Sequence, residues 1–253
     1  MAMKGSSGAD RLILKLQGYT HLSQEDRAAL ASLAGHPVLE AQPRRDLIRE
    51  GEEPKAVRLI LSGWACRYKG LPDGRRQIVG LFVPGDFCDL NVFILKQMDH
   101  SIGAITRVSY ALIAPDELDR IIGERPRIAQ ALLWHELVTA SVQREWLLNI
   151  GQRSAYERIA HLLVEMFIRL REVGLTDGHS CEFPVTQADL AEASGLTAVH
   201  VNRTLQELRR EGLIKLAQKR LTIPDLAALK STAMFNPNYL HLGREGRHLD
   251  AND

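Results

Sequence analysis

Residues 196–212, which read LTAVHVNRTLQELRREG, carry side chains whose chemistry suits the edges of DNA bases. The amide of Asn202 can bond an adenine, and the guanidinium of Arg203 can bond a guanine or a phosphate. Ala198 and Val199 offer only apolar contact, for instance to the methyl group of thymine. A helix tip that faced only solvent would carry more charge, so this composition predicts base recognition rather than catalysis.

An amphipathic helix would hold these side chains on one face. Val201, Leu205 and Leu208 recur at helical spacing and therefore share one buried stripe. Thr197 is a favourable N-cap and Gly212 a favourable stop. The segment predicts one helix of about four turns.

A shorter helix is predicted just upstream, in FPVTQADLAEASG. Thr186 can cap it, and Asp189 stands three residues later, as in a capping box. Gly195 ends this helix, so two helices meet across a tight turn. This pattern is typical of the helix-turn-helix, whose second helix enters the major groove. An ordinary helical hairpin shares the same apolar spacing and stays open as an alternative.

Two short strands are predicted downstream, at 213–216 and 220–223, and they would complete a winged helix-turn-helix. Cationic side chains that can neutralise phosphates gather in this region. They are Arg203, Arg209, Arg210, Lys215, Lys219 and Arg220. Contacts to phosphates, which position a protein without specifying sequence, are expected from Gln187, Thr197, His200 and Arg209.

The region from about residue 37 to 115 has a different texture, with short apolar segments separated by turn residues. Such spacing predicts an all-β sandwich or barrel, and Asp73-Gly74 is a strong hairpin signal. A length of 253 residues, with 45% hydrophobic and 25% charged residues, allows two domains with their own cores. The formal net charge of +1 is not decisive, because a local basic patch suffices for nucleic acid.

A long helix is predicted from about residue 127 to 149, and another begins at Ser154, with Glu157 at the capping-box position. The long helix has an apolar seam, interrupted by Arg144, that consists of Leu133, Leu137, Ala140 and Leu147. This seam could pack against the barrel or form a two-stranded dimer interface. We favour the dimer, since a helix that bridges two domains rarely finds enough core in one chain.

Cys66, Cys88 and Cys181 lie far apart and form no C-x-x-C pair, which predicts buried structural thiols rather than a zinc, disulfide or iron–sulfur framework. Cys181 precedes the two DNA-reading helices and could act as an oxidation switch. No apolar run approaches the length of a membrane span, and the start MAMKGSSGAD has no hydrophobic signal core. A cytoplasmic protein without membrane contact is expected.

Four segments together resemble the Crp/Fnr superfamily of bacterial transcription regulators: GEEPKAVRLILSG, FVPGDF, RSAYERIAHLL and VTQADLAEASGLTAVHVNRTLQELRREGLI. The resemblance implies an α+β fold. Its parts would be a cyclic-nucleotide-binding-like β-roll (jelly roll) at 1–120, a central dimerisation helix at 121–150 and a winged helix-turn-helix at 151–228. Residues 229–253 would form a tail that packs through its aromatic residues, with its last ten or so residues disordered.

In that family the recognition helix places a glutamate and an arginine on bases. Arg203 matches the arginine, whereas Val199 stands where the glutamate is common. A carboxylate would accept a hydrogen bond from a cytosine amine, which valine cannot do. The operator is therefore expected to differ at that base.

The cyclic-AMP-binding branch of the family carries Gly-Glu-Leu for the ribose and Arg-Ser for the phosphate. Asp89-Leu90 and His100-Ser101 stand at these places and are the expected effector contacts. Cyclic AMP itself is not expected, because Asp89 would repel its phosphate. A haem on His100 is not expected, since a lone loop histidine is usually solvated. An iron–sulfur cluster is not expected either, since the cysteines of the oxygen-sensing branch are missing.

The combined prediction is a homodimeric transcription regulator, without a cofactor or metal, that binds a palindromic operator in double-stranded DNA and contacts RNA polymerase. Two other classes remain as alternatives. A cupin-like metalloenzyme would need a histidine pair, but His100 is the only histidine between residues 40 and 115. A protein-interaction module that does not bind DNA would show no salt-dependent binding to duplexes.

Overall fold

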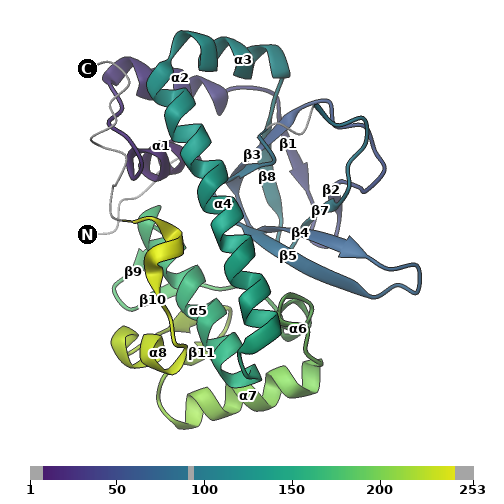
Figure 1. Cartoon of the computed structure of the whole chain (residues 1–253), viewed down its shortest axis with the longest axis vertical. Helices are drawn as coiled ribbons and strands as arrows, with labels where there is room; N and C mark the ends of the chain where they lie inside the picture. The colour runs from purple at the N-terminus through teal and green to yellow at the C-terminus, as the bar shows by residue number, and fades with distance from the viewer. Residues whose placement is uncertain (1–7, 91–93, 243–253) are drawn as a thin grey trace.

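Helix α4 (Pro126–Gln152) connects the two halves of the molecule, as Figure 1 shows. The computed structural model describes residues 8–90 and 94–242. A β-roll lies against one side of α4, and the carboxyl-terminal helices gather around its lower end. The predicted long helix is therefore confirmed, and the chain has the predicted α+β class.

The β-roll consists of two antiparallel four-stranded sheets, with strand orders β1-β8-β3-β6 and β2-β7-β4-β5. Ile60, Phe82, Ile102 and Val108 belong to the apolar core that the sheets share. Strands β4 and β5 form the hairpin predicted from Asp73-Gly74. The strands are β1 (Val38–Ala41), β2 (Asp46–Ile48), β3 (Val57–Ser62), β4 (Ala65–Gly70), β5 (Arg76–Phe82), β6 (Phe87–Cys88), β7 (Ser101–Ala104) and β8 (Val108–Ile113).

Three further helices cover the β-roll and the upper part of α4: α1 (Gly8–Gln17), α2 (Gln24–Leu33) and α3 (Pro115–Glu124). Their apolar faces share a second core with β3, β8 and α4, in which Leu16, Leu30 and Leu118 are buried. Helix α1 also brings Lys15 to Asp86, which follows β5, and Arg169 of the carboxyl-terminal half reaches the same carboxylate. These charges link α1, the β-roll and the carboxyl-terminal half.

The apolar seam of α4 is not part of the core of its own chain. Leu133, Leu137 and Leu147 are 64%, 55% and 72% exposed, respectively. The core-facing side of the helix is instead formed by residues such as Leu132 and Trp146. Packing of the seam against the β-roll, one of the two alternatives from the sequence, is therefore wrong.

The carboxyl-terminal half is built on helix α5 (Ala155–Glu172), which begins at Ser154 with the predicted capping box to Glu157. This half also contains a small sheet of order β11-β12-β10-β9. The remaining elements are β9 (Thr176–Asp177), β10 (Ser180–Glu182), α6 (Gln187–Ser194), α7 (Ala198–Arg210), β11 (Lys215–Ala217), β12 (Arg220–Thr222), α8 (Leu226–Thr232) and the 3-10 helix η2 (Pro237–Leu240).

The first wing strand begins later than predicted. Residues 213 and 214 precede β11, because Gly212 has a positive φ of 72° and the N–H of Leu213 donates to the carbonyl of Leu208 at 3.0 Å. This bond satisfies an otherwise unpaired carbonyl at the end of α7. The chain thus finishes the helix before it can enter the strand.

The tail packs through its aromatic residues as predicted. The hydroxyl of Tyr239 donates to Glu165 of α5 at 2.9 Å, and Leu240 is buried. The disorder expected for the last residues concerns a part of the chain outside the described residues. In the described part of the chain, no helix has the length and apolar character needed to cross a membrane.

Candidate nucleic-acid interface

Helices α6 and α7 meet across the predicted tight turn. Thr186 and Asp189 form the capping box that starts α6, and Gly195 ends it with a φ of 63°. Thr197 then starts α7, and its hydroxyl accepts a hydrogen bond from the N–H of His200 at 3.2 Å. The sequence folds this way because local capping groups satisfy the free N–H groups at both helix starts.

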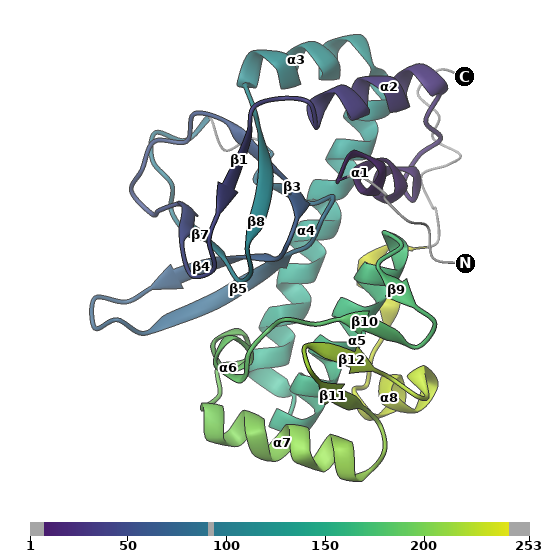
Figure 2. The ribbon, with the colours of Figure 1, turned by 180° about the vertical axis from the view of Figure 1, so that it is seen from behind.

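The outer face of α7 gathers the residues expected to read bases. Val201 lies on the buried stripe, whereas Ala198, Val199 and Arg203 are exposed. Val199 is 81% exposed. Asn202 is half-buried, and its amide oxygen accepts a hydrogen bond from Gln187 at 3.4 Å. Figure 2 shows α7 along the outer end of the molecule.

Several residues expected at phosphates already have partners within the chain. The hydroxyl of Thr197 caps α7, and Nε2 of His200 lies 3.2 Å from the guanidinium of Arg203. Arg209 donates to the carbonyl of Leu216 at 3.0 Å, which ties the end of α7 to the wing. Their contacts to phosphates therefore stay predictions.

Gln206, which is exposed on α7, was not among the residues predicted to contact DNA. Helical spacing is the signal that could have found it, because position 206 follows 199 and 203 along one face. The wing adds cations on the same half of the molecule: Lys215, Lys219 and Arg220 are exposed.

The β-roll holds α6 in place through ion pairs that the sequence did not reveal. Arg44 donates to the fully buried carboxylate of Asp189 at 2.6 and 3.3 Å. Arg76 of β5 donates to Glu192 at 2.6 Å. Asp189 thus belongs to the capping box of α6 and also forms an ion pair with Arg44, which lies 145 positions away in the sequence. The position of the reading helices consequently depends on the β-roll.

The expected effector residues form a closed cluster instead of an open site. Asp89 pairs with Arg67 and accepts a hydrogen bond from Nε2 of His100 at 2.9 Å. Nδ1 of His100 lies 2.6 Å from Asp99. The prediction of a solvated His100 is wrong, because these two carboxylates hold its ring in a largely buried position.

The charges of this cluster support one another. Burial opposes the ionised form of Asp89, but the hydrogen bond from His100 and the charge of Arg67 lower its pKa overall. Burial would lower the pKa of His100, but Asp89 raises it overall. Leu90 is buried, and the hydroxyl of Ser101 accepts a hydrogen bond from the N–H of Glu50 at 2.9 Å. None of the four residues is presented to solvent for a ligand in this arrangement.

All three cysteines are free and buried, as predicted. Cys181 is 1% exposed, and burial raises the pKa of its thiol to about 12. Oxidation sensors react through an accessible thiolate. Cys181 lacks both the exposure and the low pKa that the proposed oxidation switch requires.

The exposed recognition helix, the wing and the β-roll define a two-part DNA-binding transcription regulator. Residues 157–232 match the family model of the Crp-like helix-turn-helix domain, and residues 38–125 match that of the cyclic nucleotide-binding domain. The chain belongs to the Crp/Fnr family of transcription regulators.

Individual relatives agree with this assignment. The nitrogen fixation regulation protein FixK of Bradyrhizobium diazoefficiens is 33% identical over 175 residues, which cover 69% of this chain and 72% of FixK. The transcriptional activatory protein AadR of Rhodopseudomonas palustris is 31% identical over 205 residues, which cover 81% and 83%. The structure of FixK2 from Bradyrhizobium japonicum has the same fold, with a TM-score of 0.69 and 24% identity over 78% of this chain and 96% of FixK2.

Proposed function

We propose that this regulator binds a two-fold symmetric operator as a homodimer and activates transcription by contacting RNA polymerase in the cytoplasm, without catalysing a reaction itself. The observation that carries the proposal is the outer face of α7, where Val199 and Arg203 are exposed beside Asn202. Activation is proposed because AadR is a transcriptional activatory protein.

The exposed seam of α4 supports the homodimer. Leu133, Leu137 and Leu147 are spaced by four and then ten residues, which keeps them on one face of the helix. Pairing the seam with the same seam of a second copy would remove these leucines from water. Such an interface is isologous and has two-fold symmetry.

The symmetry of this dimer determines the expected operator. Each α7 would enter a major groove, and two such helices related by a two-fold axis read inverted half-sites. We propose half-sites whose centres are about one helical turn apart, about 34 Å. Within each half-site, Arg203 would contact a guanine, Asn202 an adenine and Val199 a thymine methyl.

The first experiment is selection of random duplexes by the purified full-length protein, followed by binding measurements against salt concentration. We expect a two-fold motif and an affinity that falls linearly with salt on logarithmic axes. No salt-dependent binding to any duplex, with or without cell extract, would contradict the proposal and favour an interaction module.

Replacing Arg203 tests the assigned base contact. Arg203→Ala should weaken binding to the selected operator by about 1–3 kcal/mol for each half-site, and should relax the preference at one base pair. Arg210→Ala is the matched control, because Arg210 is an exposed arginine on the same helix that pairs with Glu207. Equal losses in the two variants, with unchanged base preference, would show that Arg203 contacts only the phosphate backbone.

Replacing Val199 tests base reading at the position where the sequence departs from its family. Val199→Glu should change the selected motif at one base pair of each half-site toward cytosine, whose amine a carboxylate accepts. Its thermal unfolding should stay unchanged, because the side chain is 81% exposed. Val199→Gln provides the uncharged control of similar shape. If the glutamate variant selected an unchanged motif, Val199 would not contact the bases.

A further inference from the structure

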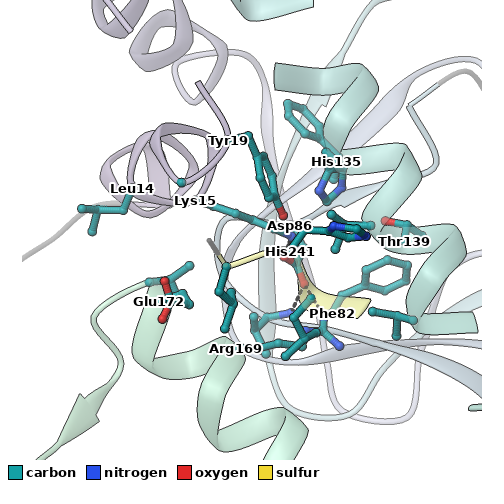
Figure 3. A pocket seen from close by; sticks show the side chains of 18 of the residues that line it. Leu14, Lys15, Tyr19, Phe82, Asp86, His135, Thr139, Arg169, Glu172 and His241 are labelled. Carbon is teal, nitrogen blue, oxygen red and sulfur yellow. Dashed lines mark hydrogen bonds and ion pairs between the residues drawn. The ribbon is translucent and has the colours of Figure 1, made fainter. Parts of the chain in front are cut away.

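A cavity of about 590 Å³ lies where α1, β5, α4, α5 and the chain around Leu240 meet (Figure 3). This volume falls within the range of about 300–1,000 Å³ that is common for small-molecule sites. The lining contains none of the four residues expected to contact an effector. The cavity therefore lies beside the closed cluster around Asp89, with which it shares the side chain of Arg67.

His135 of α4 contributes an unusual side chain to this cavity. It is only 5% exposed, and its ring packs against Phe87 with centroids 6.4 Å apart. Within residues 8–90 and 94–242, no hydrogen-bond partner of its imidazole is found. Its ring nitrogens are not among the fully enclosed polar atoms that lack a partner in the described part of the chain, which is consistent with their facing the cavity. Because this ring lines the cavity, a bound molecule could supply the missing partner.

The imidazole of His135 is neutral at pH 7. Burial, together with the charge of Lys15 and smaller contributions from Arg169 and Arg67, lowers its pKa to about 3. Asp86 acts in the opposite direction. A neutral imidazole keeps one N–H donor and one acceptor nitrogen. The surrounding charges that oppose a proton on His135 favour a negative charge beside it.

The wall of the cavity is polar around His135 and mostly apolar elsewhere. Its ionic side chains are the cations Lys15, Arg27, Arg67 and Arg169 and the carboxylates Asp86 and Glu172. Arg67 and Arg169 also pair with Asp89 and Glu165, respectively, which do not line the cavity. Apolar side chains on several sides include Phe82, Val138, Val142 and Leu240. Mixed walls of this kind favour a molecule with an apolar body and one anionic group.

We propose that this cavity binds a small organic anion with an apolar body, whose anionic group accepts a hydrogen bond from the N–H of His135 beside Lys15 and Arg169. Such a ligand would contact α1, α4 and α5 at once. The proposal concerns a ligand site and does not depend on DNA binding.

Two fluorescent probes that share one ring system can test this site in the full-length protein. One is 8-anilinonaphthalene-1-sulfonate, which is an apolar anion, and the other is N-phenyl-1-naphthylamine, which lacks the sulfonate. We expect the anion to bind saturably at one site per chain and more tightly than the neutral probe.

Two variants locate the bound probe. His135→Phe keeps an aromatic ring against Phe87 but removes the donor, so affinity for the anion should fall about tenfold while affinity for the neutral probe stays unchanged. Thr139→Trp fills the cavity from α4 and should abolish saturable binding of both probes, whereas Gln152→Trp at the exposed end of α4 should not.

Equal affinities of the two probes for the parent protein and for His135→Phe would overturn the proposal. Saturable binding that survives Thr139→Trp would also overturn it, because the probe would then occupy another surface, such as the exposed seam. Thermal unfolding of each variant shows whether it is folded. If Thr139→Trp does not fold, the proposal is still tested by whether His135→Phe lowers affinity for the anionic probe but not for the neutral one.

Discussion

Leu137→Glu should convert the protein into a folded monomer that binds its operator at least about 100-fold more weakly. Leu137 is 55% exposed in the single chain, so glutamate costs little there. In the proposed dimer, the two-fold axis would bring two carboxylates together within an apolar seam. Loss of the second half-site removes an avidity of about 10²–10⁴. Sedimentation equilibrium and operator titration measure the two effects.

Leu71→Glu is the control for this substitution. Leu71 is 54% exposed in the turn between β4 and β5, so it matches Leu137 in type and exposure but lies away from α4. This variant should remain dimeric and bind its operator normally. If the Leu137→Glu protein remained dimeric with unchanged operator affinity, the seam would not be part of the dimer interface.

Asp86→Asn should lower the free energy of unfolding by about 3–5 kcal/mol at pH 7. The carboxylate of Asp86 is almost fully buried, pairs with Lys15, and accepts hydrogen bonds from Arg169 at 3.1 Å and from the N–H of Val83 at 2.9 Å. The substitution leaves two largely buried cations without their shared anion. Urea unfolding at pH 7 measures the loss.

The parent protein and the Asp86→Asn variant should also differ in how their stability changes at acid pH. Burial opposes ionisation of Asp86, but Lys15 and Arg169 lower its pKa overall. A carboxyl whose pKa is lower in the folded state stabilises the protein above its unfolded pKa, about 3.9, and loses this contribution as pH falls through the folded value. The difference in stability between parent and Asp86→Asn should therefore shrink below about pH 4.

Glu40→Gln is the control, because Glu40 pairs with Arg107 on the surface and both side chains are exposed. It should leave the free energy of unfolding unchanged across this pH range. A difference between parent and Asp86→Asn that stays constant down to pH 2 would contradict the role assigned to the ionised carboxylate.

Much of the DNA-reading half could be predicted from the sequence because its signals are local. Capping by Thr186, Thr197 and Ser154 depends on groups within three positions, and all three caps are present. The apolar stripe of α7 likewise depends only on helical spacing. Family resemblance added the order of the two halves, which local signals alone do not specify.

The remaining features depend on contacts between distant segments. Arg44 meets Asp189 across 145 positions, and no local pattern marks either residue as a partner of the other. His100 resembles a solvated loop residue until Asp89 and Asp99 enclose it. Residues 8–33 were assigned to the β-roll without a predicted element, although they form α1 and α2, and α1 supplies Lys15 to Asp86 and one wall of the cavity.

The packing of Trp64 against Phe183 has a consequence for how the molecule loses its structure. These rings belong to the β-roll and the winged helix, lie 5.7 Å apart between centroids, and are members of one apolar cluster that runs through both halves. Separation of the two halves would expose that cluster to water, so the packing between the halves opposes their independent unfolding. The protein should therefore melt as one cooperative body, and its DNA-reading half should not survive as an excised fragment.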